Sequence, residues 1–69
     1  MKTIGEQINQ FLAEARLPAI RLSEASGIKN AYISRLRRGK QKDIFSTKAD
    51  ALRSAMYRLN PDAARKALE

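Results

Sequence analysis

Apolar residues recur along this chain at the three- to four-residue spacing of α-helices. The first stripe predicts a helix over residues 3–15, and its members are Ile4, Ile8, Phe11, Leu12 and Ala15. Thr3 and Glu6 have the spacing of a capping box, in which each side chain binds a free backbone N–H of the other residue. Gly5 lies in the first turn, where glycine costs about 0.8–1 kcal/mol relative to Ala.

A second, shorter helix is expected to begin at Pro18, whose missing N–H is not needed in a first turn. Its expected buried side consists of Ile20, Leu22 and Ala25. Gly27 should end this helix, because a sharp stop before the next helix usually needs a residue with positive φ.

A third helix is predicted over residues 30–37, with Ile33 and Leu36 facing inward and Ile28 packing at the turn before it. Gly39 is expected to end it as a C-cap. The basic loop that follows closes with two apolar anchors, Ile44 and Phe45.

Two more helices complete the predicted fold. Ser46 or Thr47 can cap a fourth helix, whose inward face is Leu52, Ala55, Met56 and Leu59. The run Asn60-Pro61-Asp62 is a strong restart pattern, and it predicts a short last helix over about residues 61–68. Strand patterns are absent and Val does not occur, so we expect one all-α domain of five helices spanning residues 1–69.

The composition narrows the function. The chain has no His and no Cys, which excludes zinc sites and catalysis built on them. Its seven acidic residues are scattered along the sequence, so we expect neither an enzyme nor a metal or cofactor. The apolar runs are too short to span a bilayer and the start lacks a signal-peptide core, which predicts a cytoplasmic protein.

Positive charge is concentrated in one segment. The net charge is +7, and six of the 14 basic residues fall at positions 29–42, within a window that has no acidic residue between Glu24 and Asp43. A basic helix directly after a tight turn is typical of proteins that place a helix in the major groove of DNA.

The turn residues carry a resemblance to a known family. The positions concerned are Leu22, Gly27, Ile28, Ile33, Ser34 and Gly39. Their spacing resembles the helix-turn-helix of the Cro and cI-type phage repressors, with the motif at about residues 18–38. The resemblance implies a lambda-repressor-like fold that binds a palindromic double-stranded DNA operator as a homodimer, with no small-molecule effector.

The chain departs from that family at three places. Pro18 and Ala19 stand where members often have Thr-Gln or Asn-Gln, whose Gln touches a phosphate; Arg21 could replace that contact. Arg37 and Leu12 stand where many members have a Glu–Arg ion pair. Lys29 occupies the usual Ser or Thr cap position.

The resemblance, together with the direction of each side chain on the third helix, assigns candidate DNA contacts. The candidate base-reading residues are Lys29, Asn30, Ala31, Ser34 and Arg35. The candidate phosphate-binding residues are Arg21, Tyr32, Arg37, Arg38, Lys40 and Lys42. For Tyr32, core packing is an equal alternative. A polar helix face can also be merely solvated, but the turn, the spacing and the charge together favour DNA.

The last helix has an apolar side that predicts a dimer contact. The candidate dimerisation residues are Tyr57, Ala64, Ala67 and Leu68. In the alternative arrangement, this helix packs back on the first helix of its own chain.

The expected function is therefore that of a transcriptional repressor of phage or mobile-element type, associated with the nucleoid and regulating its own operon. Antitoxins and anti-CRISPR-associated regulators share this class of fold, and the sequence does not separate them. Two other functions remain open: an RNA-binding helical module, and an antitoxin or protein-interaction module with a basic face.

Overall fold

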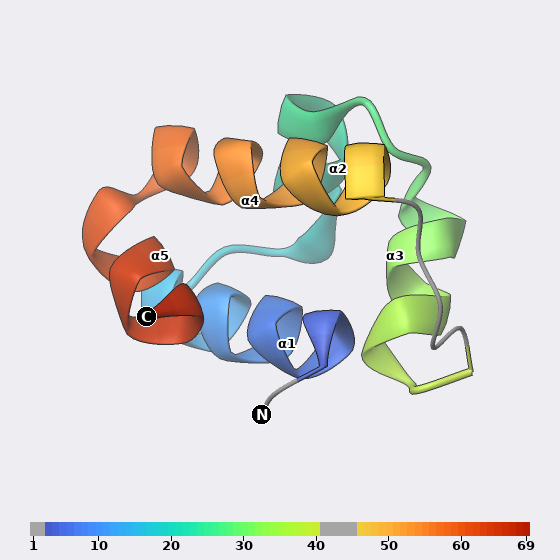
Figure 1. Cartoon of the computed structure of the whole chain (residues 1–69), viewed down its shortest axis with the longest axis horizontal. Helices are drawn as coiled ribbons and strands as arrows, with labels where there is room; N and C mark the ends of the chain where they lie inside the picture. The colour runs from blue at the N-terminus through green and yellow to red at the C-terminus, as the bar shows by residue number, and fades with distance from the viewer. Residues whose placement is uncertain (1–2, 41–45) are drawn as a thin grey trace.

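The computed structural model describes residues 3–40 and 46–69, and these residues form five helices with no strand among them. The helices are α1 (Ile4–Ala15), α2 (Ala19–Ser26), α3 (Asn30–Arg37), α4 (Ser46–Leu59) and α5 (Pro61–Leu68). In the view of Figure 1, α1 and α4 run across the molecule, while α3 and α5 close its opposite ends. The prediction of an all-α, five-helix fold is confirmed. None of the helices in the described segments has the length and apolar character needed to cross a bilayer.

The helix ends follow the predicted local chemistry, with small shifts. The capping box is formed: the Glu6 N–H donates to Thr3 Oγ1 at 3.2 Å and the Thr3 N–H donates to Glu6 Oε1 at 3.0 Å. Pro18 is the N-cap of α2 rather than its first residue. α4 begins at Ser46, so the two residues predicted to cap it, Ser46 and Thr47, both lie within the helix.

All five helices contribute to one core. The largest fully buried side chains come from α1 to α4 and are Ile8, Phe11, Leu22, Ile33, Leu36, Leu52 and Met56. Ile20 was predicted to be buried, but it is 46% exposed, because α2 turns Leu22 rather than Ile20 toward the core. The predicted anchors Ile44 and Phe45 lie outside the described residues.

Gly5 marks the closest approach of α1 to α3. A Cβ atom on Gly5 would lie 1.9 Å from the carbonyl oxygen of Leu36 and 2.8 Å from its carbonyl carbon. Glycine is therefore required here by the contact between two backbones, although it weakens α1 as an isolated helix. This contact fixes how the end of α3 rests on the start of α1.

α5 packs inside its own chain, against α1 and α4. Asn60 caps it by accepting from the Ala63 N–H at 3.1 Å, and Pro61 begins it, as the sequence predicts. Gln10 of α1 donates to the carbonyl of Lys66 at 3.0 Å, near the end of α5. The small side chains of Ala63, Ala64 and Ala67 allow the close packing, since all three are buried.

Candidate nucleic-acid interface

The turn between α2 and α3 is held by hydrogen bonds of its own residues. Gly27 has φ 77°, in the left-handed region, and its N–H donates to the Ser23 carbonyl as α2 ends. Ser23 Oγ donates to the carbonyl of Ile28 at 2.5 Å, and the Ile28 N–H donates to Ser26 Oγ at 3.2 Å. The half-buried Ile28 packs against the core. These contacts set the direction in which α3 leaves α2.

A side chain of α4 also supports this turn. Arg58 Nη2 donates to the carbonyl of Ala25 at 2.8 Å, which satisfies a carbonyl in the last turn of α2. Nothing in the sequence pattern identifies this contact, because the two residues are 33 positions apart.

α3 divides into a buried side and an open side, as the sequence predicts. Ile33 and Leu36 are buried. Asn30, Ala31 and Arg35 are exposed. Of the other candidate base-reading residues, Ser34 is only half-buried and Lys29 is the exposed N-cap of the helix, with no side-chain cap bond. The structure thus brings these five positions together along the open side and leading end of one helix.

Most basic side chains on or beside α3 have no partner among the described residues, whereas most of those elsewhere are paired. Over most of the described chain the Arg and Lys side chains have partners, as in the contacts of Arg21 with Glu24, Arg53 with Asp50 and Lys66 with Glu14. Within the described residues, the basic side chains with no hydrogen bond, ion pair or ring contact to another described residue are Arg16, Lys29, Arg35, Arg38 and Lys40. All except Arg16 lie on α3 or directly beside it.

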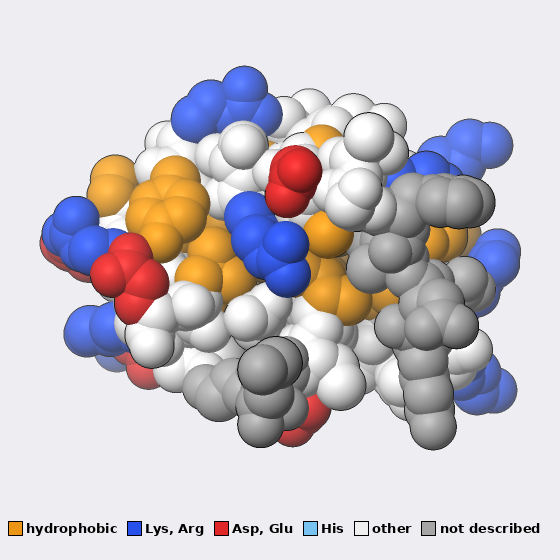
Figure 2. Space-filling model, viewed as in Figure 1, with side chains coloured by type: hydrophobic (Ala, Val, Ile, Leu, Met, Phe, Trp, Pro, Cys, Tyr) orange, Lys and Arg blue, Asp and Glu red, His pale blue; other side chains and the backbone are white. Residues whose placement is uncertain are grey.

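The predicted phosphate-binding residues are placed less uniformly. Arg38 and Lys40 are exposed just after α3. The C-cap of α3 is Arg38 and not Gly39 as predicted; Gly39 follows it with φ 75°, and the Lys40 N–H donates to the Arg35 carbonyl at 3.0 Å. In Figure 2, basic side chains project from the edge of the molecule where Figure 1 has α3, and no described acidic side chain is visible there. Arg21 lies on α2 within 3.9 Å of Glu24, and Lys42 lies outside the described residues.

Arg37 makes a contact that the sequence analysis missed. Its Nε donates to Asn9 Oδ1 at 2.6 Å, and Asn9 Nδ2 donates to the Arg37 carbonyl at 3.2 Å. The chain lacks the Glu–Arg ion pair that is common in the phage repressors its sequence resembles. The two hydrogen bonds between Asn9 and Arg37 instead join the same two helices, α1 and α3. Arg37 therefore directs its Nε toward α1 rather than outward.

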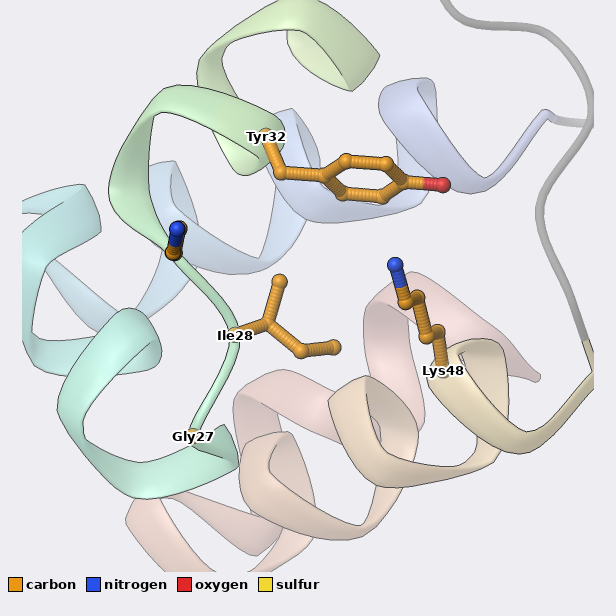
Figure 3. Close-up of a pocket in the computed structure, with 5 residues that line it drawn as sticks. Gly27, Ile28, Tyr32 and Lys48 are labelled. Atoms are coloured by element: carbon orange, nitrogen blue, oxygen red, sulfur yellow. The ribbon is translucent and has the colours of Figure 1, made fainter.

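Tyr32 lies beside a hollow in the surface near the start of α3. The half-buried ring packs against the core, and Lys48 of α4 places its Nζ 4.4 Å from the ring centroid. In Figure 3 the Lys48 side chain points toward the Tyr32 ring, and Ile28 lies below the ring and beside Lys48. The hollow has a volume of about 300 Å³ and is lined by Gly27, Ile28, Lys29, Tyr32 and Lys48. Lys48 could not be predicted as part of this site from the sequence, because no local pattern connects it to Tyr32.

The prediction that Ala64 and Ala67 form a dimer contact was wrong. Ala64 and Ala67 are buried in the monomer, at 0% and 4% exposure, so they are not available to a second chain. The alternative, in which the last helix packs on the first, is the arrangement found. Leu68 is half-buried against the same core. Tyr57 is 36% exposed and its hydroxyl donates to Glu69 Oε2 at 2.6 Å, a hydrogen bond that raises the pKa of Tyr57 above its ordinary value.

Comparisons of this chain with models of known protein families, with curated protein sequences and with solved structures yield no match. The chemistry of the surface itself is therefore the basis for a functional proposal.

Proposed function

We propose that this chain is a sequence-specific double-stranded DNA-binding protein that acts as a transcriptional repressor and inserts α3 into the major groove. The observation that carries the proposal is a set of four cations on and beside α3 that have no partner in the described part of the chain: Lys29, Arg35, Arg38 and Lys40. These cations have no carboxylate partner among the described residues, so they keep their charge for a polyanion. A short helix projecting from a fixed turn suits the groove.

Three exposed side chains of α3 would read bases. Arg35 can donate two hydrogen bonds to O6 and N7 of guanine, and Asn30 can pair with N6 and N7 of adenine. Ala31 is small and apolar, which suits contact with a thymine methyl group. Ser34 and Lys29 border this set. Arg38 and Lys40 would bind phosphates, which fixes the position of the helix without reading sequence.

A single short helix reads only a few base pairs, so useful specificity requires two copies on a palindromic operator. Their half-sites would lie about one helical turn, ~34 Å, apart. The repressor would act in the cytoplasm, at the nucleoid, by blocking polymerase, and its own concentration would regulate it. Its setting would be the autoregulated operon of a phage or mobile element.

A gel-shift comparison tests the proposal with three ligands of equal length: the duplex upstream of the gene, a random duplex and an RNA. A DNA-reading repressor binds the upstream duplex most tightly, the random duplex more weakly through phosphates alone, and the RNA least. Tightest binding to the RNA would support the RNA-binding module instead. Failure to bind any of the three would support a protein-interaction or antitoxin role and overturn the proposal.

A further inference from the structure

The hollow at the start of α3 has the chemistry of an anion site. Two lysines, Lys29 and Lys48, and the hydroxyl-bearing Tyr32 line it together with Gly27 and Ile28, and no carboxylate is among these residues. The ammonium groups and the phenol are hydrogen-bond donors. Ile28 and the tyrosine ring supply apolar wall next to these donors, so the hollow is suited to a ligand that is charged on one side and apolar on the other.

Lys48 lies against the Tyr32 ring and has no carboxylate partner among the described residues. Its Nζ lies 4.4 Å from the Tyr32 ring centroid, within the range of a cation–π contact. The ring restrains the ammonium group but uses none of its three N–H donors, unlike the carboxylates that pair with Arg53 and Lys66. Lys29, which also lines the hollow, has no side-chain partner among the described residues.

We propose that this hollow binds one sugar–phosphate unit. Lys48 Nζ, Lys29 Nζ and the Tyr32 hydroxyl would donate to the phosphate oxygens, and the deoxyribose would lie against Ile28. The inference rests on the proposed function, in which the unit belongs to the DNA backbone beside the leading end of α3. It moves Lys29 from the base-reading set to phosphate binding. The same chemistry would also accept a free nucleotide, and the experiment separates these two sources.

Lys48→Met tests the site in the full chain, because Met keeps the apolar stem over the tyrosine ring and removes only the charge. Lys66→Met is the matched control, since it removes one lysine charge from α5. One phosphate contact contributes about 0.9 to the slope of the logarithm of affinity against the logarithm of salt concentration. When the salt is raised from 50 to 200 mM, the factor by which affinity for duplex DNA falls should therefore be about threefold smaller for Lys48→Met than for the wild type. At low salt, Lys48→Met should lose the same factor of affinity for the operator duplex and for the random duplex. The control Lys66→Met should keep the wild-type salt slope.

Tyr32→Phe is a milder second variant that keeps the ring under Lys48 and removes one donor. We expect it to weaken binding to the operator duplex and to the random duplex by the same few-fold factor. The salt slope should stay unchanged, because a hydroxyl carries no charge. A loss confined to the operator would overturn the phosphate assignment.

An NMR titration identifies the source of the phosphate. Deoxynucleoside monophosphate and inorganic phosphate are added separately to the ¹⁵N-labelled full chain. We expect shifts at the amides of residues 27–32, stronger with the nucleotide because of its sugar, and absent in Lys48→Met. If the wild type binds duplex DNA but Lys48→Met keeps its salt slope and no shifts appear, the site is overturned and the function stands. Nucleotide-induced shifts without any duplex binding would overturn the function, and the site would stand as a nucleotide site.

Discussion

At the scale of single residues, Arg35 is the side chain on which recognition of the DNA sequence would depend. It is exposed on the middle of α3 and has no side-chain partner among the described residues. A bidentate contact to guanine contributes about 1–3 kcal/mol of discrimination. We therefore expect Arg35→Ala to weaken operator binding by this amount and random-duplex binding much less, in fluorescence anisotropy titrations at one salt concentration.

Arg53→Ala is the control for that measurement, because Arg53 pairs with Asp50 on α4 and its loss changes the net charge equally. Equal losses on both duplexes for Arg35→Ala would reassign Arg35 to phosphate binding.

Gly5 gives a second prediction at this scale, on stability. Ala is the better helix former by about 0.8–1 kcal/mol, but its Cβ would lie 1.9 Å from the Leu36 carbonyl oxygen. The clash involves backbone atoms, so α1 and α3 must separate, and overpacking of this kind costs about 1–3 kcal/mol. The clash outweighs the propensity gain, and we expect Gly5→Ala to lower the Tm in a thermal melt.

Ala13→Gly, at an exposed position of the same helix, measures the propensity difference without a clash. A Gly5→Ala protein more stable than the wild type would show that the two helices can separate at little cost.

At the scale of elements, the tie between α1 and α3 decides how α3 is presented. Asn9 and Arg37 share two hydrogen bonds across the two helices. A double-mutant cycle of Asn9→Ala and Arg37→Ala in urea should give a coupling energy of about 0.5–1.5 kcal/mol, the net value of a hydrogen bond. The variants should be compared for DNA binding as well as for stability.

The salt slope separates the two roles of Arg37 in that comparison. A residue that only ties the helices changes the affinity without changing the slope, whereas a phosphate contact lowers the slope by about one unit. We expect Asn9→Ala to keep the wild-type slope. Coupling near zero would mean that the hydrogen bond between the two side chains contributes nothing, because Arg37→Ala keeps the backbone carbonyl that accepts from Asn9 Nδ2.

At the scale of the whole molecule, the position of α5 constrains how two copies could meet. Its apolar side is used within the monomer, so a dimer on the operator must form through other surfaces. Leu68 is half-buried against the core, and we expect Leu68→Glu to cost about 1–3 kcal/mol of stability, because it moves a carboxylate into an apolar contact. Calorimetry measures this loss, and Ser54→Glu, at an exposed site of α4, matches the charge change.

The same variant tests the dimer. Below its Tm, Leu68→Glu should still bind a palindromic duplex with two chains per duplex, as measured by analytical ultracentrifugation. If Leu68→Glu kept the wild-type Tm but bound the operator poorly and as a monomer, α5 would be part of the dimer contact. One wild-type chain per palindrome at saturation would rule out dimeric binding.

The sequence by itself determined the five helices and several of their ends. Apolar spacing, the Thr3–Glu6 box, Gly27 and Asn60-Pro61 act within a few residues, so they can be recognised without knowing the fold. The same local periodicity predicted which residues of α3 face inward and which remain open. For Ile20 it failed, because a short helix with several apolar residues can turn in more than one direction.

Only the tertiary structure decided the contacts between elements that lie far apart in the sequence. The backbone approach at Gly5, the hydrogen bonds of Asn9 with Arg37, and the Lys48 ammonium over Tyr32 join residues on different helices. Packing also gave the apolar side of α5 to its own core rather than to a partner. Periodicity shows that a helix has an apolar side, but the element that covers that side is chosen by how all five helices fill one core.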